Sequence, residues 1–350
     1  MVDWDLAVSV GARLAGQGPV VSRGEADEVV AELREGAASS TQPVREFTGL
    51  ASTAATAEVL VVDRRGWLKA NADGFAHVLA PVIAKIEERK GAPSGFTQAV
   101  GSRMTGAEVG AVLGFLAGKV LGQFDPFYAP AGSTASGRLL LVAPNIVHAE
   151  RELGVDPHDF RLWVCLHEET HRVQFTAVPW MREHIEGMIG TLVEGIETDP
   201  TKLASFLGDG VKRMGDVIRG TDGASLIDLL STPEQRVLLD QVTAVMSLLE
   251  GHADVVMDGV GPEVIPTVAE IRKRFNQRRK GSGNLDRLLR RLLGLDAKMA
   301  QYRDGEKFVQ GVIDRVGMEG FNKVWVEPAN LPTRAEVGDP EAWVRRIHGA

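Results

Sequence analysis

The order of hydrophobic and polar residues along the chain predicts a mainly helical protein. Residues 22–37, SRGEADEVVAELREGA, place a Ser three residues before a Glu, which is a capping-box pattern, and end near a Gly. Residues 71–90, NADGFAHVLAPVIAKIEERK, are hydrophobic at helical spacing, and Pro81 should kink or divide this helix. Residues 106–124 carry many small side chains, which suits a helix packed closely by its neighbours.

Two short segments are typical of strands. Residues 57–67, AEVLVVDRRGW, contain a β-branched run, and residues 137–145, GRLLLVAPN, form a short hydrophobic run between Gly137 and Pro144. Helix patterns dominate the rest of the chain. The expected fold class is therefore mainly α, with a small β element.

One predicted helix is interrupted by ionisable residues. Residues 162–175 read LWVCLHEETHRVQF. Asp156 can cap this helix, Pro157 suits its first position, and Asp159 adds negative charge to the first turn, so we expect the helix to run to about Phe175. Burying polar groups costs free energy unless they have partners, so these residues need a partner.

The interruption is an HExxH motif at residues 167–171. His167 and His171 are one helical turn apart, so both imidazoles can reach one Zn²⁺. Glu168 can then accept a proton from a water on the metal and pass it to a leaving amine. A five-residue match often falls by chance on a solvated helix, but the hydrophobic residues before His167 are not typical of a solvent face.

A third protein ligand is expected, because catalytic zinc sites usually have three. The metzincin pattern would need Gly and His where this chain has Gln174 and Ala177, so that class is excluded. A later helix, capped at Thr232 with Pro233 at its first position, is interrupted by EGHAD at 250–254.

Within EGHAD, Glu250 and Asp254 share a helix face. Glu250 is the favoured third ligand, and Asp254 could orient a ligating histidine from outside the metal shell. His252 points to nearly the opposite side and is more typical of a hydrogen-bonded core histidine. Other candidates follow the motif more closely in the sequence: Glu183, His184, Glu186, Glu194 and Glu197.

Composition and charge restrict the classes of function. The net charge of −8 argues against non-specific nucleic-acid binding, and the basic cluster at 272–280, RKRFNQRRK, is better explained as a solvated helix end before a Gly-Ser-Gly loop. Cys165 is the only cysteine, which favours a reducing compartment. The chain shows neither a signal-peptide pattern nor a run approaching roughly 18 apolar residues, so we expect a soluble cytoplasmic protein without a membrane partner.

These segments resemble a family of zincin-like metallopeptidases of actinobacteria, often labelled zinc-dependent metalloprotease or "coenzyme F420 biosynthesis associated". The resemblance spans about Asp3 to Trp325. Its HExxH falls on His167, Glu168 and His171, and its EGxA segment begins at Glu250. The matching segments are VVDRRGWLKANADGF (61–75), GRLLLVAPNIV (137–147), LWVCLHEETHRVQF (162–175), SLLEGHADVVMDGVG (247–261) and KMAQYRDGEKFVQGVIDRVG (298–317). Nothing in the chain resembles a deazaflavin site.

The resemblance implies a helical zincin fold of the gluzincin type, with peptidase chemistry on a peptide or protein substrate. Zincins place an edge strand beside the active-site helix, where extended peptides add as another strand. GRLLLVAPN (137–145) is the candidate, with an ordinary core strand as the alternative. Zincins also aim a Tyr, His or Arg at the developing oxyanion, and Tyr302 is the candidate here, with packing as its alternative role.

The sequence thus predicts a zinc metallopeptidase in one domain at 1–326, with a mostly helical N-terminal part at 1–135 and a catalytic part at 136–326. The tail at 327–350 is expected to wrap the surface or fray. Loops around one or two shorter helices are expected at 198–233. Two alternatives remain: a non-catalytic zinc-binding scaffold or interaction protein, and a zinc hydrolase of non-peptide amides.

Overall fold

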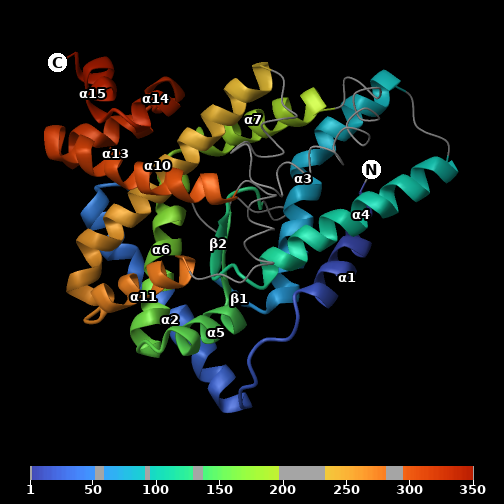
Figure 1. Cartoon of the computed structure of the whole chain (residues 1–350), viewed down its shortest axis with the longest axis horizontal. Helices are drawn as coiled ribbons and strands as arrows, with labels where there is room; N and C mark the ends of the chain where they lie inside the picture. Colours follow the sequence, from blue (N-terminus) through green and yellow to red (C-terminus); the bar gives the residue numbers. More distant parts are fainter. Residues whose placement is uncertain are drawn as a thin grey trace. The chain divides into compact units, whose positions relative to one another are not determined.

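The computed structural model describes residues 2–51, 59–90, 95–128, 137–196, 233–280 and 295–349. Within these ranges helices dominate and three short strands form one sheet, so the expected fold class is confirmed (Figure 1). In chain order the elements are α1 (Trp4–Leu14), α2 (Arg23–Thr48), β1 (Val59–Val62), α3 (Arg64–Lys90), α4 (Gly95–Ala117), β2 (Gly122–Asp125), β3 (Arg138–Val142), α5 (Ala143–Leu153), α6 (Pro157–Ala177), α7 (Met181–Ile196), α10 (Pro233–Val264), α11 (Val268–Lys280), α13 (Leu295–Phe321), η1 (Asn322–Trp325), η2 (Pro328–Asn330), α14 (Arg334–Val337) and α15 (Pro340–His348). The predicted loops at 198–233 lie almost wholly outside the described residues.

The chain divides into two compact units. The first comprises residues up to Arg182 together with Val256–Arg274, and the second comprises Glu183–Val255 and the residues from Phe275 onward. The first unit contains the sheet and α6.

The sheet has the order β1-β3-β2, with β1 parallel and β2 antiparallel to β3. All five residues of β3 are buried, because this strand is paired on both sides. The prediction that GRLLLVAPN provides the edge strand is therefore wrong, and its alternative, an ordinary core strand, is correct. The edge strands of this sheet are β1 and β2.

Helices cover both faces of the sheet within the first unit. On one face Leu140 and Val142 of β3 join a buried cluster with Trp67 and Leu68 of α3 and with residues of α4. On the other face Phe124 of β2 contacts the ring of Phe175 on α6, with 5.8 Å between ring centroids. The strands thus place α6 against β2.

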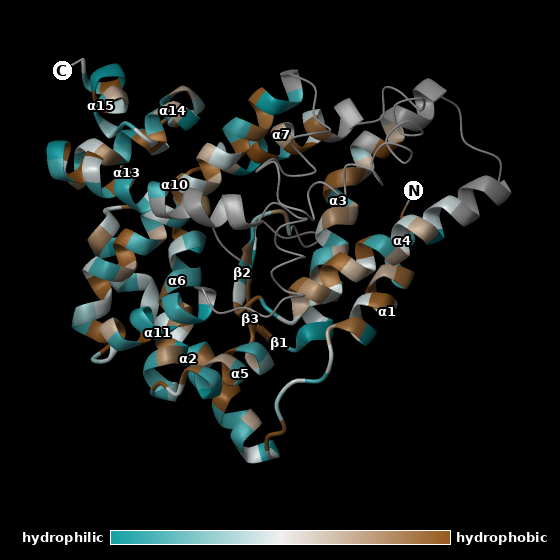
Figure 2. Cartoon of the chain, in the orientation of Figure 1, coloured by the Kyte–Doolittle hydropathy of each residue, from teal (hydrophilic) through white to brown (hydrophobic). Residues whose placement is uncertain are grey.

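Helix α4 packs against α1 through small residues, as the sequence predicts. A Cβ at Gly110 would lie 2.5 Å from the carbonyl oxygen of Ala7, so only glycine permits this approach. Both helices carry hydrophobic residues among polar ones (Figure 2). The predicted helix at 106–124 is wrong at its end, because α4 stops at Ala117 and residues 122–124 belong to β2.

Helix α2 runs beside α6 and is longer than the capping pattern indicated. Ser22 caps it by accepting a hydrogen bond from the Glu25 amide, and it continues to Thr48 with Pro43 inside. At Gly36 the missing side chain makes room for Cys165 of α6, whose Sγ would lie 3.1 Å from an added Cβ. Helices α2 and α6 can therefore approach each other closely at this point.

In the second unit, α10 and α13 meet at two glycines. A Cβ at Gly251 would lie 2.2 Å from the carbonyl carbon of Gly305, and one at Gly305 would lie 2.0 Å from the carbonyl oxygen of Ser247. Gly251 therefore admits a neighbouring helix, and that neighbour is α13. This contact fixes the stretch of α10 that carries EGHAD.

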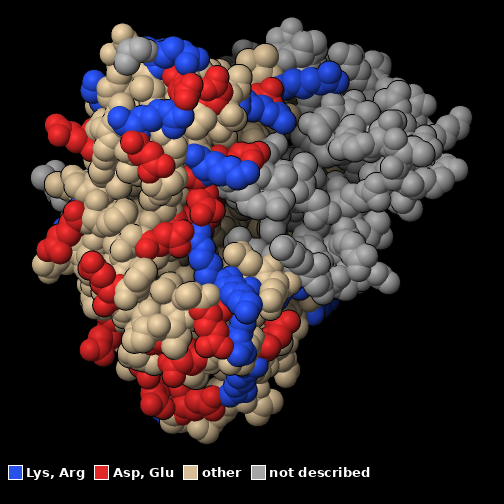
Figure 3. Space-filling view, turned by 60° about the vertical axis from the view of Figure 1, so that its left-hand side comes forward, with Lys and Arg blue, Asp and Glu red and all other residues tan. Residues whose placement is uncertain are grey.

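The C-terminal segment folds rather than fraying. It forms η2, α14 and α15, and Trp343 of α15 is fully buried with its ring against Phe308 of α13. On the face drawn in Figure 3, acidic and basic side chains are interspersed. Among the described helices, none has the length and apolar character needed to cross a membrane.

Candidate metal centre

Helix α6 begins where the sequence predicts. The Asp156 side chain accepts a hydrogen bond of 2.9 Å from the Asp159 amide, and Pro157 occupies the first turn. Asp159, in the first turn, is held as well, because the backbone amide and the side-chain hydroxyl of Thr267 both donate hydrogen bonds to its carboxylate. The helix continues to Ala177, two residues beyond the predicted end. Its start is thus fixed before the motif is reached.

His167 and His171 project from one side of α6. Their Nε2 atoms are 3.3 Å apart, and their rings meet edge to face with 4.8 Å between centroids. Trp163, one turn earlier, stacks on the His167 ring at 6.3 Å. The Nδ1 of His171 hydrogen-bonds to Oε1 of Gln174 at 3.0 Å. Both imidazoles are half-buried, so neighbours restrict their orientation.

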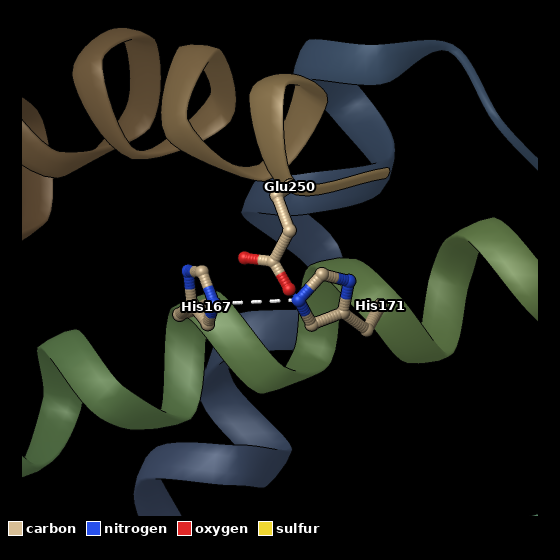
Figure 4. A group of neighbouring side chains, drawn as sticks. All are labelled: His167, His171 and Glu250. Carbon is tan, nitrogen blue, oxygen red and sulfur yellow. Dashed lines mark hydrogen bonds between the residues drawn. The ribbon is translucent and has the colours of Figure 1, made fainter. Parts of the chain in front are cut away.

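One group of potential metal ligands occurs among the described residues: His167, His171 and Glu250. Their ligand atoms all lie within 4.8 Å of one another, and the Glu250 carboxylate points toward the two imidazoles (Figure 4). Two imidazole nitrogens and one carboxylate oxygen are a common donor set for catalytic zinc. Two donors bound tetrahedrally to one zinc ion are separated by about 3.3 Å, given bonds of about 2.0–2.1 Å. The separation of the two imidazoles fits that value.

Glu168 follows His167 but lies toward the sheet. It is only 7% exposed. A Cβ at Gly122 of β2 would lie 2.5 Å from Cγ of Glu168 and 2.9 Å from its Oε1. The glycine in the edge strand thus makes room for this carboxylate next to the histidine pair.

Glu169 lies on the opposite side of α6, toward α2. It is fully buried and accepts a hydrogen bond of 2.6 Å from Arg172, which also donates to Thr41 of α2 at 2.9 Å. Burial raises the pKa of Glu169, while Arg172 and Thr41 act in the opposite direction. This carboxylate anchors α6 to α2 and lies away from the histidine pair.

Cys165 also faces α2. It is buried, its thiol donates to the Leu33 carbonyl at 3.4 Å, and burial raises its pKa far above the usual range. A metal ligand would have to be the thiolate, so this cysteine does not suit a metal site.

The residues of EGHAD lie in different surroundings. Glu250 belongs to the ligand group, whereas His252 is fully buried with its ring stacked on Phe321 and edge-on to Trp325, each at 5.4 Å. His252 is therefore a core residue. Asp254 lies one turn after Glu250 on α10 and is half-buried.

The remaining candidates are not gathered at this group. Tyr302 lies on α13, but its side chain is outside the described part of the chain. The ligand group contains neither Glu183, His184 nor Glu186 of α7, all of which are described. Of the other two, Glu197 and the side chain of Glu194 fall outside the described residues.

Two residues at the site were not identified as functional from the sequence. The sequence pattern places Gly122 in a helix, because the four-residue strand GQFD is too short for a clear alternating pattern. Gln174 stands in the sequence only as a departure from the metzincin pattern. Its signal was a polar residue at helical spacing from His171, next to the hydrophobic Val173 and Phe175.

Comparisons with known proteins found one similar solved structure and one matching family model. A solved structure described as a "putative hydrolase with a novel fold from Chloroflexus aurantiacus" is similar to this chain, with 31% identity and a TM-score of 0.69, and covers 100% of both chains. No curated protein matches the sequence. The family model for zincin-like metallopeptidases matches residues 2–344, which is nearly the whole chain. This protein therefore belongs to the zincin-like metallopeptidase family.

Proposed function

We propose that this protein is a zinc-dependent peptidase in which His167, His171 and Glu250 hold the metal and Glu168 is the general base. The observation that carries the proposal is the convergence of two imidazoles and a carboxylate within 4.8 Å. Three protein ligands are typical of a catalytic zinc site, whereas structural sites usually have four, often including cysteine. Cys165 is buried and its pKa is raised, so it does not suit a fourth ligand of a structural site. This favours a catalytic zinc site over a structural one.

The proposed chemistry divides between the metal and the chain. Zinc, when bound, supplies a Lewis acid that polarises a carbonyl and lowers the pKa of water. Glu168 takes the proton of the attacking water and returns it to the leaving amine. Its low exposure and its packing against Gly122 restrict the carboxylate to few rotamers, as a positioned base requires.

The proposed substrate is an extended peptide. β2 is an edge strand of the sheet, and Gly122 in it contacts Glu168. An edge strand can bind an extended chain through main-chain hydrogen bonds. We therefore assign to β2 the role that the sequence suggested for β3. Asp254 and Tyr302 keep their proposed roles, orienting a ligating histidine and stabilising the oxyanion.

A peptide library tests this proposal. Zinc-reconstituted protein should cleave peptide bonds, detected by mass spectrometry, and a chelator should abolish cleavage. His171→Ala should lose both zinc and activity, because it removes one of three ligands. Absence of zinc from the reconstituted wild-type protein would refute the proposal, as would cleavage that survives both the chelator and the substitution.

Two substitutions on α10 test the third ligand. Glu250→Ala should weaken zinc binding by more than the 10–100-fold typical of losing an outer-shell partner. His252→Phe, which keeps a ring between Phe321 and Trp325, is the matched control and should retain wild-type affinity. If the control loses zinc and Glu250→Ala retains it, Glu250 is wrongly assigned.

A further inference from the structure

Gln174 is a fully buried amide one turn after His171 on α6. Its Oε1 lies 3.0 Å from Nδ1 of His171. A buried amide needs hydrogen-bond partners wherever it lies. Here the partner is one of the two imidazoles of the ligand group, so the contact affects the chemistry of that ring.

An amide oxygen can only accept a hydrogen bond, so the ring nitrogen that faces it must carry the proton. A neutral imidazole has one N–H and one lone pair. With the proton on Nδ1, the lone pair of His171 is on Nε2, the atom that faces His167 at 3.3 Å. The reversed amide would select the opposite tautomer, with a proton on Nε2 of His171 where the lone pair is needed.

We infer that Gln174 is a positioning residue that fixes His171 in the Nδ1–H tautomer, so that its Nε2 is preset as a metal donor. The role of Nε2 as a metal donor rests on the proposed metal site, whereas the tautomer itself is a property of the metal-free protein. Partners of this kind orient ligating histidines and make the donor nitrogen more basic. The special feature here is that the partner comes from the same helix, three residues after the ligand.

The geometry of α6 explains why one helix can supply both groups. Residues at positions i and i+3 are neighbours on a helix surface. Glu169, two residues before His171, faces α2 and is bonded to Arg172, so its carboxylate is already engaged away from the imidazoles. Gln174 provides a neutral acceptor, which avoids placing another carboxylate in the buried part of this helix.

Nitrogen-15 NMR of the metal-free wild-type protein tests the tautomer directly. Long-range couplings should show His171 protonated at Nδ1 at a pH where the ring is neutral. Gln174→Met keeps the side-chain length and removes the acceptor, so it should increase the Nε2–H form. It should also weaken zinc binding by about 10–100-fold in a chelator competition. Gln174→Glu, which restores an acceptor, should recover the wild-type tautomer and most of the affinity.

Thr170→Val is the matched control, because Thr170 is equally buried on α6 and bonds only to the Leu166 carbonyl in the contacts described. It should change neither the tautomer nor zinc affinity, even if stability falls. A wild-type His171 protonated at Nε2, or wild-type zinc affinity in Gln174→Met, would overturn the inference. The wild-type spectrum decides the tautomer even if Gln174→Met does not fold. Failure of the proposed peptidase function would appear separately, as absent hydrolysis with the tautomer unchanged.

Discussion

The two sides of α6 carry adjacent glutamates in different surroundings. On the side toward α2, Glu169 is fully buried and bonded to Arg172, which also reaches Thr41. On the side toward β2, Glu168 lies against Gly122. Both residues belong to one motif and differ by one position. The comparison shows that helix facing, rather than residue type, separates the carboxylate that anchors α6 to α2 from the carboxylate for which we propose the role of general base.

Exchanging each carboxylate for an amide should give the largest difference between the two sides. Glu168→Gln should lower turnover by about 10²–10⁴-fold, the usual contribution of a general base, while keeping zinc. Glu169→Gln should lower turnover less than about tenfold, because an amide oxygen can still accept from Arg172. Steady-state rates at saturating zinc measure both. Equal losses in two folded, zinc-loaded variants would contradict the division of roles.

Removing the cation on the α2 side should mainly affect stability. Arg172→Met leaves Glu169 buried without its ion-pair partner, which costs up to about 3–5 kcal/mol in unfolding free energy. Arg151→Met, which breaks an exposed pair with Glu25, is the control and should cost less than about 1 kcal/mol. Denaturant unfolding measures both. The anchor interpretation of Glu169 is wrong if the two variants are equally stable.

Filling the space beside Glu168 should reduce activity without removing the metal. Gly122→Ala would place a Cβ 2.5 Å from Cγ of Glu168, so the carboxylate must shift. A misplacement of about 1 Å can cost about 10²-fold in rate, so we expect a loss of roughly 10–10²-fold with zinc affinity unchanged. Gly118→Ala is the control, because its nearest new contact is 3.5 Å. Full activity in Gly122→Ala would show that β2 does not position the base.

A third carboxylate, Glu336, provides the smallest test of how paired carboxylates behave. Burial alone would raise its pKa, but hydrogen bonds from Arg346 and Thr333 outweigh burial and lower it. Because the folded-state pKa lies below the unfolded value, this stabilisation is present above about pH 4.5 and is lost as pH falls through the lowered pKa.

The expected contribution of the Glu336–Arg346 pair to the unfolding free energy is about 1 kcal/mol, since Arg346 is partly exposed. Glu336→Gln should flatten the decrease in unfolding free energy below pH 4.5, the ordinary pKa of Glu336. Unfolding curves of both proteins at several acidic pH values measure this. If the unfolding free energy of the variant decreases with falling pH as steeply as that of the wild type, the acid sensitivity comes from other groups.

Local signals allowed much of α6 and α10 to be predicted from the sequence. The Asp156 cap and Pro157 mark the start of α6, and the EGHAD interruption marks the stretch of α10 that carries Glu250. These features depend on residues a few positions apart. The HExxH spacing likewise depends only on helix geometry.

Long-range pairing was not predictable in the same way. The central position of β3 depends on β1 and β2, and four-residue strands give too few positions for a reliable alternating pattern. Thr41 of α2, which accepts a hydrogen bond from Arg172, lies 131 residues away from it in the sequence. The same limit applied to Gly122, whose importance appears only when Glu168 lies beside it.

X-ray absorption at the zinc edge tests the central claim most directly. Zinc-reconstituted wild-type protein should give a first shell of nitrogen and oxygen at about 2.0–2.2 Å, with the outer-shell signature of two imidazoles and no sulfur. Glu250→Ala should lose one oxygen donor, while Glu168→Gln should leave the protein ligands unchanged. A sulfur neighbour at about 2.3 Å, or a single imidazole, would contradict the assignment of His167, His171 and Glu250.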